Sequence, residues 1–109
     1  LLLDEPFRAM DTVSKSKMHQ HLLDIHQRFQ TTILLITHDL VEAILLADTV
    51  LVMTTRPGTI KLNIDVDLPR PRSNDMIVSE HFTKLQKQAI AAVHEEARKA
   101  FERGEKELA

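Results

Sequence analysis

The sequence predicts an α/β fold, because short apolar runs alternate with stretches of helical periodicity over the first 53 residues. Runs suited to strands occur at residues 1–3, 32–36 and 49–53, and the segments between them repeat apolar residues every three or four positions. Strand, helix, strand, helix, strand in this order is typical of a parallel sheet with crossover helices. The 109 residues, 43% of them hydrophobic, are enough for one small domain.

The first helix is expected to begin near Asp11 or Thr12, since either side chain can cap its free N–H groups. The joint "QRFQTT" that follows this helix has no glycine to end it. "TILLI" at residues 32–36 is compact and β-branched, which favours a strand buried on both faces. The apolar stripe of the first helix is formed by Met18, Leu22, Ile25 and Phe29.

A second helix is predicted over "HDLVEAILLAD", residues 38–48, and "TVLVM", residues 49–53, is predicted to be a third apolar strand of the sheet. The apolar face of this second helix consists of Leu40, Ala43, Ile44 and Ala47.

The C-terminal part differs in pattern. "RPG" at residues 56–58 predicts the turn of a β-hairpin, and apolar residues then alternate with polar ones from 60 to 68, as in a strand with one solvated face. "PRPRS" is a stiff linker, and a long helix is expected from about 79 to 107. This helix is interpreted as an amphipathic cover of the sheet rather than a dedicated partner-binding helix. Its stripe is Phe82, Leu85, Ala89, Val93, Ala97 and Ala100.

Composition excludes several classes of protein. The net charge of −2, with only Arg70 and Arg72 near the linker, argues against a nucleic-acid site. Cysteine is absent, which excludes disulfides and fits a reducing compartment. Apolar runs of at most five residues are too short for a membrane span.

Titratable residues directly follow two of the predicted strands. Asp4 and Glu5 come after the first strand, and Thr37–Asp39, "THD", come after the second. Ligands bind at the carboxyl ends of parallel strands, so these groups are expected to meet at one edge. Such a set suits phosphoryl transfer, with one carboxylate for Mg²⁺, one for water and a histidine for a phosphate oxygen. Alternatively, the two acids simply begin a loop.

Together these motifs resemble the second half of the ATPase subunit of an ATP-binding-cassette (ABC) transporter. "LLLDEPF" resembles its Walker B strand, "AMD" its D-loop, and "ITHDLVEAILLADTVLVM" the segment with the switch histidine. "RPGTI" and "VDLPRPR" resemble importers of nitrate, sulfonate, taurine and related solutes. The resemblance covers residues 1–72 and implies a partial RecA-like P-loop NTPase core there, in the Walker B half. Residues 73–109 would form a helical tail.

The resemblance implies a role for each matching residue. Asp4 would hold Mg²⁺, Glu5 would act as general base on the attacking water, and His38 would contact the γ-phosphate of ATP. Asp11 would contribute to the nucleotide site from the loop that crosses to a second, identical ATPase subunit. Membrane permease subunits are the other implied partners, with the protein peripheral on the cytoplasmic face of the inner membrane and not inserted in it.

Some family features are missing. The sequence has only two glycines, Gly58 and Gly104, so it cannot supply a Gly-rich phosphate loop or the signature segment. Arg8 stands where the family usually has a small residue, which affects the D-loop conformation. We therefore expect a C-terminal fragment of an importer ATPase that is inactive alone. An inert interaction module for full-length subunits is the alternative. The family strand between 33–36 and 50–53 is also absent.

Two other arrangements of polar residues are not expected to form sites. His19, His21 and His26, with Asp24 between them, are expected to be solvated surface residues rather than metal ligands, because His21 points away from the other two. "HD" at His38 also occurs in metal-dependent phosphohydrolases, but suitably placed further ligands are missing.

Overall fold

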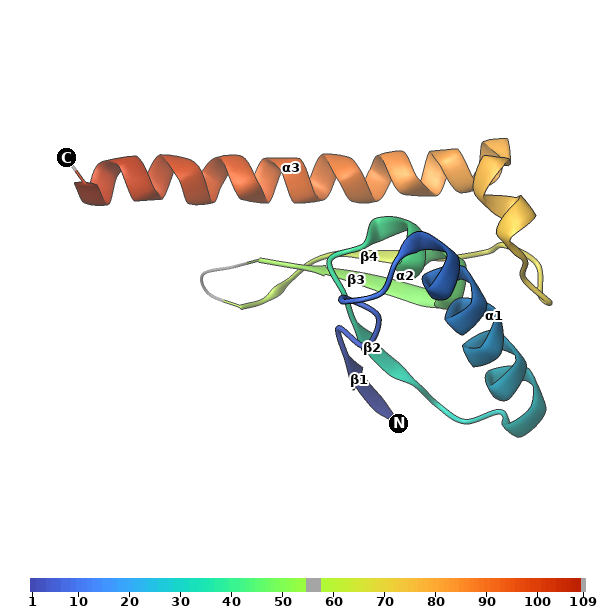
Figure 1. The fold of residues 1–109 in the computed structure, drawn as a ribbon. Coiled ribbons are helices and arrows are strands. Elements are labelled where there is room, and N and C mark those ends of the chain that lie inside the picture. Colours follow the sequence, from blue (N-terminus) through green and yellow to red (C-terminus); the bar gives the residue numbers. More distant parts are fainter. Residues whose placement is uncertain (55–57, 109) are drawn as a thin grey trace.

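The computed structural model describes residues 1–54 and 58–108 and shows two small sheets, with α2 and α3 packed on the antiparallel one (Figure 1). One sheet pairs β1 with β2 in parallel, and the other pairs β3 with β4 antiparallel. The predicted α/β class is thus confirmed. In chain order the elements are β1 (Leu2–Asp4), α1 (Thr12–Phe29), β2 (Leu34–Ile36), α2 (Leu40–Leu46), β3 (Thr49–Met53), β4 (Ile60–Asp65), a short 3₁₀ helix (Asn74–Val78) and α3 (Glu80–Leu108).

The strand β3 does not join the parallel sheet, so the prediction of one continuous parallel sheet is wrong. It pairs with β4 instead, with Val50 opposite Ile64. A short connection joins β3 to β4, so pairing these two strands costs little chain entropy. Among the described residues, no strand lies between β2 and β3 that could join them in one sheet. The β-hairpin is confirmed, while Arg56 and Pro57 of the expected "RPG" turn lie outside the described residues.

The parallel pair β1–β2 has an uncovered apolar face, which corrects the expectation that residues 32–36 are buried on both sides. Leu2 and Leu34 are paired in register and are 63% and 59% exposed. The alternate residues Leu3 and Leu35 are half-buried. The face with Leu2 and Leu34 therefore meets solvent, and the opposite face is only partly covered.

The first helix, α1, is ended by side-chain and backbone caps. Asp11 accepts a hydrogen bond from the backbone N–H of Ser14 (2.7 Å), which confirms the expected N-terminal cap. At the other end Gln30 takes the left-handed conformation, with φ of 54°, that glycine adopts more readily. The helix therefore ends at Gln30, in a conformation usually taken by glycine, although residues 27–32 contain no glycine.

The helix α1 buries only part of its predicted apolar stripe, since Met18, Leu22 and Ile25 are half-buried. His19 and Leu23 are its buried residues, while Phe29 is 64% exposed. The reason is that α1 packs mainly on the short helix α2, which covers only a narrow strip of it.

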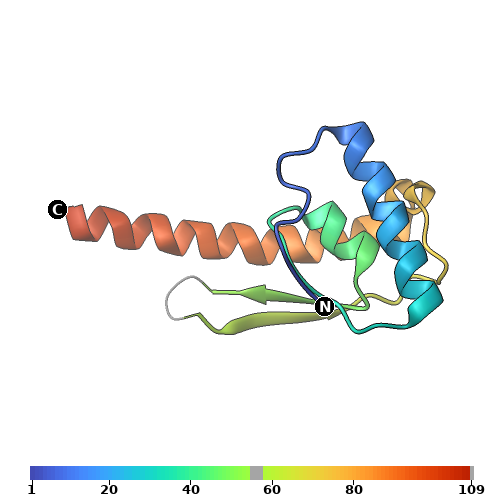
Figure 2. The same ribbon diagram turned by 60° about the horizontal axis from the view of Figure 1, so that its bottom comes forward.

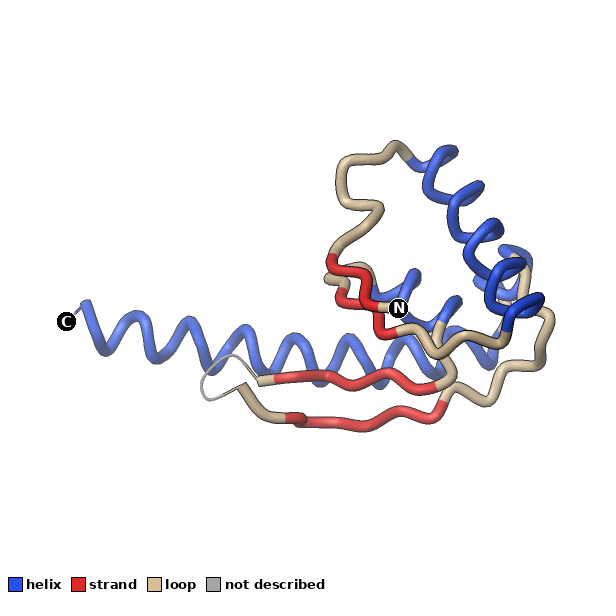
Figure 3. Tube along the Cα trace, turned by 90° about the horizontal axis from the view of Figure 1, so that it is seen from below, coloured by secondary structure: helices blue, strands red, loops and turns tan. Residues whose placement is uncertain are grey.

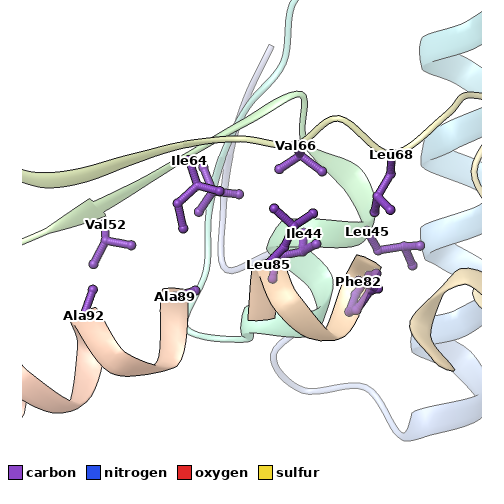
Figure 4. Packing of buried hydrophobic residues seen from close by; sticks show 11 residues of the cluster. Ile44, Leu45, Val52, Ile64, Val66, Leu68, Phe82, Leu85, Ala89 and Ala92 are labelled. Atoms are coloured by element: carbon purple, nitrogen blue, oxygen red, sulfur yellow. The ribbon is translucent and has the colours of Figure 1, made fainter. Parts of the chain in front are cut away.

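One hydrophobic core lies between α2, α3 and the β3–β4 hairpin (Figure 4). Its largest fully buried side chains are Ile44, Leu45 and Phe82. Figures 2 and 3 show α3 running along the hairpin. Ala92, rather than the predicted Val93, faces the core from α3, with 7% of its surface exposed against 38% for Val93.

The core spans residues on both sides of position 72, and the domain boundary expected there stays a prediction. The molecule measures 53 × 28 × 25 Å because α3 extends well beyond the rest. In the described part of the chain, no helix combines the length and apolar character that crossing a membrane requires.

Candidate functional site

The parallel pairing of β1 and β2 brings Glu5 next to His38. Asp4 is opposite Ile36 in the register, and the N–H of Glu5 donates to the carbonyl of Ile36 (2.8 Å). The two strands therefore end side by side, and Nδ1 of His38 contacts Oε1 of Glu5 although 33 positions separate them in the sequence. This is the edge at which the sequence places the candidate residues.

Glu5 has a backbone conformation that is unusual for a residue with a side chain. Its φ of 47° lies in the left-handed region, which costs a non-glycine residue roughly 1–2 kcal/mol. The turn is held by the Ile36 carbonyl and by the N–H of Arg8, which donates to the Glu5 carbonyl (3.4 Å). Such strain persists only where surrounding contacts fix it, and it often accompanies functional sites.

The pocket at this edge is open and has a volume of about 410 Å³. Within it the side chain of Glu5 is 20% exposed and that of His38 93% exposed, so one carboxylate is sheltered and its imidazole partner faces solvent. Its lining combines acidic and basic groups, namely Glu5, Arg8, Lys15, Thr37, His38, Asp39 and Glu42.

The loop after β2 is held by hydrogen bonds on both sides of His38. The hydroxyl of Thr37 donates to Oε2 of Glu42 (2.8 Å) and accepts from the N–H of Asp39 (3.0 Å). Asp39 caps α2 by accepting from the N–H of Glu42 (3.1 Å), and it pairs with Lys15 of α1 (3.5 Å). The position of His38 is therefore determined by its two neighbours.

The two remaining predicted residues lie outside this pocket lining. Asp4 is the last residue of β1 and is exposed, and no group of three metal-binding side chains occurs among residues 1–54 and 58–108 as far as they are described. Asp11 is the cap of α1, and the N–H of Ser14 lowers the pKa of its carboxyl. Its expected contact with a second subunit stays a prediction.

Sequence reasoning missed the buried polar groups behind the pocket and was wrong about one histidine. His19 is 7% exposed rather than solvated, because its ring packs edge-on against Phe7 and lies beside Glu42. His21, by contrast, is exposed as expected. Glu42 is 3% exposed and is the only charged residue within α2, which is a sequence signal that could have drawn attention to it.

Comparison with known proteins places this geometry in context. The chain is 52% identical over 69 residues to a nitrate import ATP-binding protein of Synechocystis sp., covering 63% of this chain and 26% of that protein. It is 40% identical over 102 residues to a nitrate transport protein of Klebsiella oxytoca, covering 92% of this chain and 39% of that protein. An aliphatic sulfonates import ATP-binding protein of Pseudomonas savastanoi is 43% identical over 96 residues, with 87% and 39% covered. No family model matches the chain.

These similarities identify the chain as a homologue of the ATP-binding subunits of ABC importers of the nitrate and sulfonate type. The resemblance read from the motifs is confirmed. The chain spans between a quarter and two fifths of the length of these relatives. The matched region is therefore only a part of each relative.

Proposed function

We propose that this chain is the C-terminal part of the ATP-hydrolysing subunit of an ABC importer, and that it supplies the water-activating side of the nucleotide site. The intact subunit would couple ATP hydrolysis to the uptake of an oxyanion or organic solute such as nitrate, sulfonate or taurine. The observation that carries the proposal is the contact between Glu5 and His38 at the end of the paired strands β1 and β2.

In this proposal Glu5 is the general base. Its carboxylate is sheltered, faces the pocket and is held in a strained turn, so it can take the proton of an attacking water without first reorganising. Nδ1 of His38 contacts Oε1 of this carboxylate, and the rest of the imidazole faces solvent, where it is free to donate to a phosphate oxygen of ATP. Positioning and charge stabilisation account for most of the catalysis of phosphoryl transfer.

Asp4 fits the role of magnesium ligand. Its carboxylate is exposed at the end of β1, beside Glu5, and a hard cation takes oxygen ligands. Mg²⁺ usually keeps several waters and shares its remaining positions with substrate phosphates, so one or two carboxylates from the protein are sufficient. When bound, the ion would supply neutralisation of phosphate charge.

The partners in this proposal are a second ATPase subunit, reached through the loop that contains Asp11, and the membrane permease subunits. The assembly would lie on the cytoplasmic face of the inner membrane. The division into an ATPase part, residues 1–72, and a helical tail, residues 73–109, belongs to the same proposal. Because the chain has two glycines and no phosphate loop, the 109-residue polypeptide is expected not to hydrolyse ATP by itself.

The test is made in a complete ATPase subunit that contains this segment. Glu5→Gln keeps the shape of the side chain but cannot accept the proton, so phosphate release is expected to fall by about 10²–10⁴-fold while ATP still binds. His38→Ala is expected to slow turnover as well, and His21→Ala, at an exposed position of α1, serves as the matched control. Turnover by Glu5→Gln at a rate close to that of the unmodified subunit would exclude Glu5 as the base.

A further inference from the structure

A buried polar pair lies directly behind the pocket, between α1 and α2. Nε2 of His19 is 3.2 Å from Oε1 of Glu42, and the two side chains are 9% and 4% exposed. Within the part of the chain that the structure describes, these two atoms have no hydrogen-bond partner. Each is therefore the other's polar neighbour, in a place where an unpaired polar atom is costly.

The second oxygen of Glu42 holds the segment that carries His38. Oε2 accepts from the hydroxyl of Thr37, and the N–H of Glu42 donates to the carboxylate of Asp39. Both neighbours of His38 are thus bonded to one residue of α2. Since the side chain of His38 is itself 93% exposed, its position is restricted by these bonds together with its contact to Glu5.

His19 makes the corresponding contact to the segment that carries Glu5. Its ring packs edge-on against Phe7, with centroids 5.2 Å apart and an angle of 77° between the planes. Phe7 is 5% exposed and lies two positions after Glu5. The pair His19–Glu42 consequently touches both loops that meet in the pocket, one through an aromatic contact and the other through hydrogen bonds.

We infer that His19 and Glu42 form a positioning pair that keeps Glu5 and His38 in contact for the hydrolysis proposed above, on which this inference rests. Packing alone does not require an acid at position 42, because apolar residues of similar volume replace buried ion pairs at little cost or with a gain in stability. The hydrogen bonds of Glu42 with Thr37 and Asp39 fix the loop around His38, and the polar contact with His19 holds the Glu42 carboxylate between the two helices. Glu42 and Thr37 are positioning residues in this scheme, and the reacting atoms are touched by Glu5 and His38.

The experiment measures ATP hydrolysis and nucleotide affinity in a complete subunit that contains this segment. Glu42→Leu keeps the bulk of the side chain and removes both of its polar contacts, and it is expected to lower kcat by about 10–100-fold, the effect of an ångström-scale misplacement. The KM for ATP is expected to change by less than about threefold, because the pair does not touch the nucleotide. Glu42→Gln keeps an acceptor for Thr37 and should recover most of the lost kcat. Glu95→Leu is the control, since Glu95 is a half-exposed residue of α3 that pairs with Lys61 of β4.

A second pair of variants decides the question if Glu42→Leu does not fold. Thr37→Val is isosteric and removes only the hydroxyl that bonds Glu42, so it should lower kcat, whereas Thr37→Ser should restore it. Unchanged kcat in Thr37→Val, or equal losses in Glu42→Leu and Glu42→Gln, would overturn the positioning role. If these variants are active while Glu5→Gln is not, the proposed function stands and this inference fails. ATP hydrolysis that survives Glu5→Gln would remove the basis of both.

Discussion

Replacing Arg72 by methionine would measure how strongly one buried guanidinium joins α2 to the segment after β4. The side chain of Arg72 is 1% exposed, and its Nη1 donates to the carbonyls of Ile44 (3.3 Å), Leu45 (3.2 Å) and Ala47. Its Nη2 donates to the carbonyls of Val66 (3.2 Å) and Leu68 (3.5 Å). Burial lowers the pKa of Arg72 to about 10, which still leaves it charged at neutral pH.

The size of the effect follows from the carbonyl groups that lose their donor. Those of Ala47, Val66 and Leu68 lie outside the helices and strands, so no helix or strand hydrogen bond replaces Arg72. A buried acceptor left without a partner costs about 1–3 kcal/mol, so these three groups give a loss of roughly 3–9 kcal/mol. That is a large share of the roughly 5–15 kcal/mol by which a small domain is stable. At roughly 4–8 °C per kcal/mol, Tm should fall by about 10 °C or more.

The assay is thermal and urea unfolding of the 109-residue chain and of Arg72→Met, followed by far-ultraviolet circular dichroism. Arg70→Met is the matched control. Arg70 also reaches the end of α2, where it donates to the carbonyl of Leu46 (2.9 Å) and pairs with Asp48, but its side chain is 30% exposed and water can replace it. The control should lose less than about 1 kcal/mol. Equal losses of stability in the two variants would show that the buried bonds of Arg72 are not what joins these segments.

Three further outcomes are expected for the same chain. Its stability should decrease as the pH falls below about 4, because hydrogen bonds in the folded state lower the pKa of three carboxyl groups. Their contribution to stability is present above the unfolded pKa and is lost as they protonate. Asp67→Asn removes the titrating carboxylate that contacts His81, so it should flatten this acid limb in pH-dependent urea titrations, and an unaltered limb would contradict the assignment. Hydrogen exchange should be faster in β1 and β2 than in β3 and β4, since only the second pair is packed against the core, and equal protection would refute this. Phe82→Ala should cost about 3–5 kcal/mol in chemical unfolding, while Val78→Ala, at an 88% exposed position, should be nearly neutral; similar losses in both would argue against the described core. The three carboxyl groups whose lowered pKa underlies the expected loss of stability in acid are those of Asp11, Asp67 and Glu95.

Local properties of the chain were predictable from the sequence. Apolar runs and helical spacing indicate the strands and helices, and Asp11 is one of the two caps that the sequence predicts for α1, because a cap bond joins residues only three positions apart. The meeting of Glu5 and His38 was predictable for a related reason. Both follow predicted strands directly, and parallel strands end at the same edge.

Other properties were decided only in the tertiary structure, because they depend on which segments come together. The partner of β3 could not be read from its own residues, since an apolar strand suits either a parallel or an antiparallel neighbour. Arg72, in a segment that reads as a polar linker, is buried because five carbonyls converge on it, three from the distant end of α2 and two from the residues shortly before it. His19 looks like a surface histidine until Phe7 and Glu42 enclose it. Burying a polar group is favourable only where partners surround it, and long-range folding determines where those partners lie.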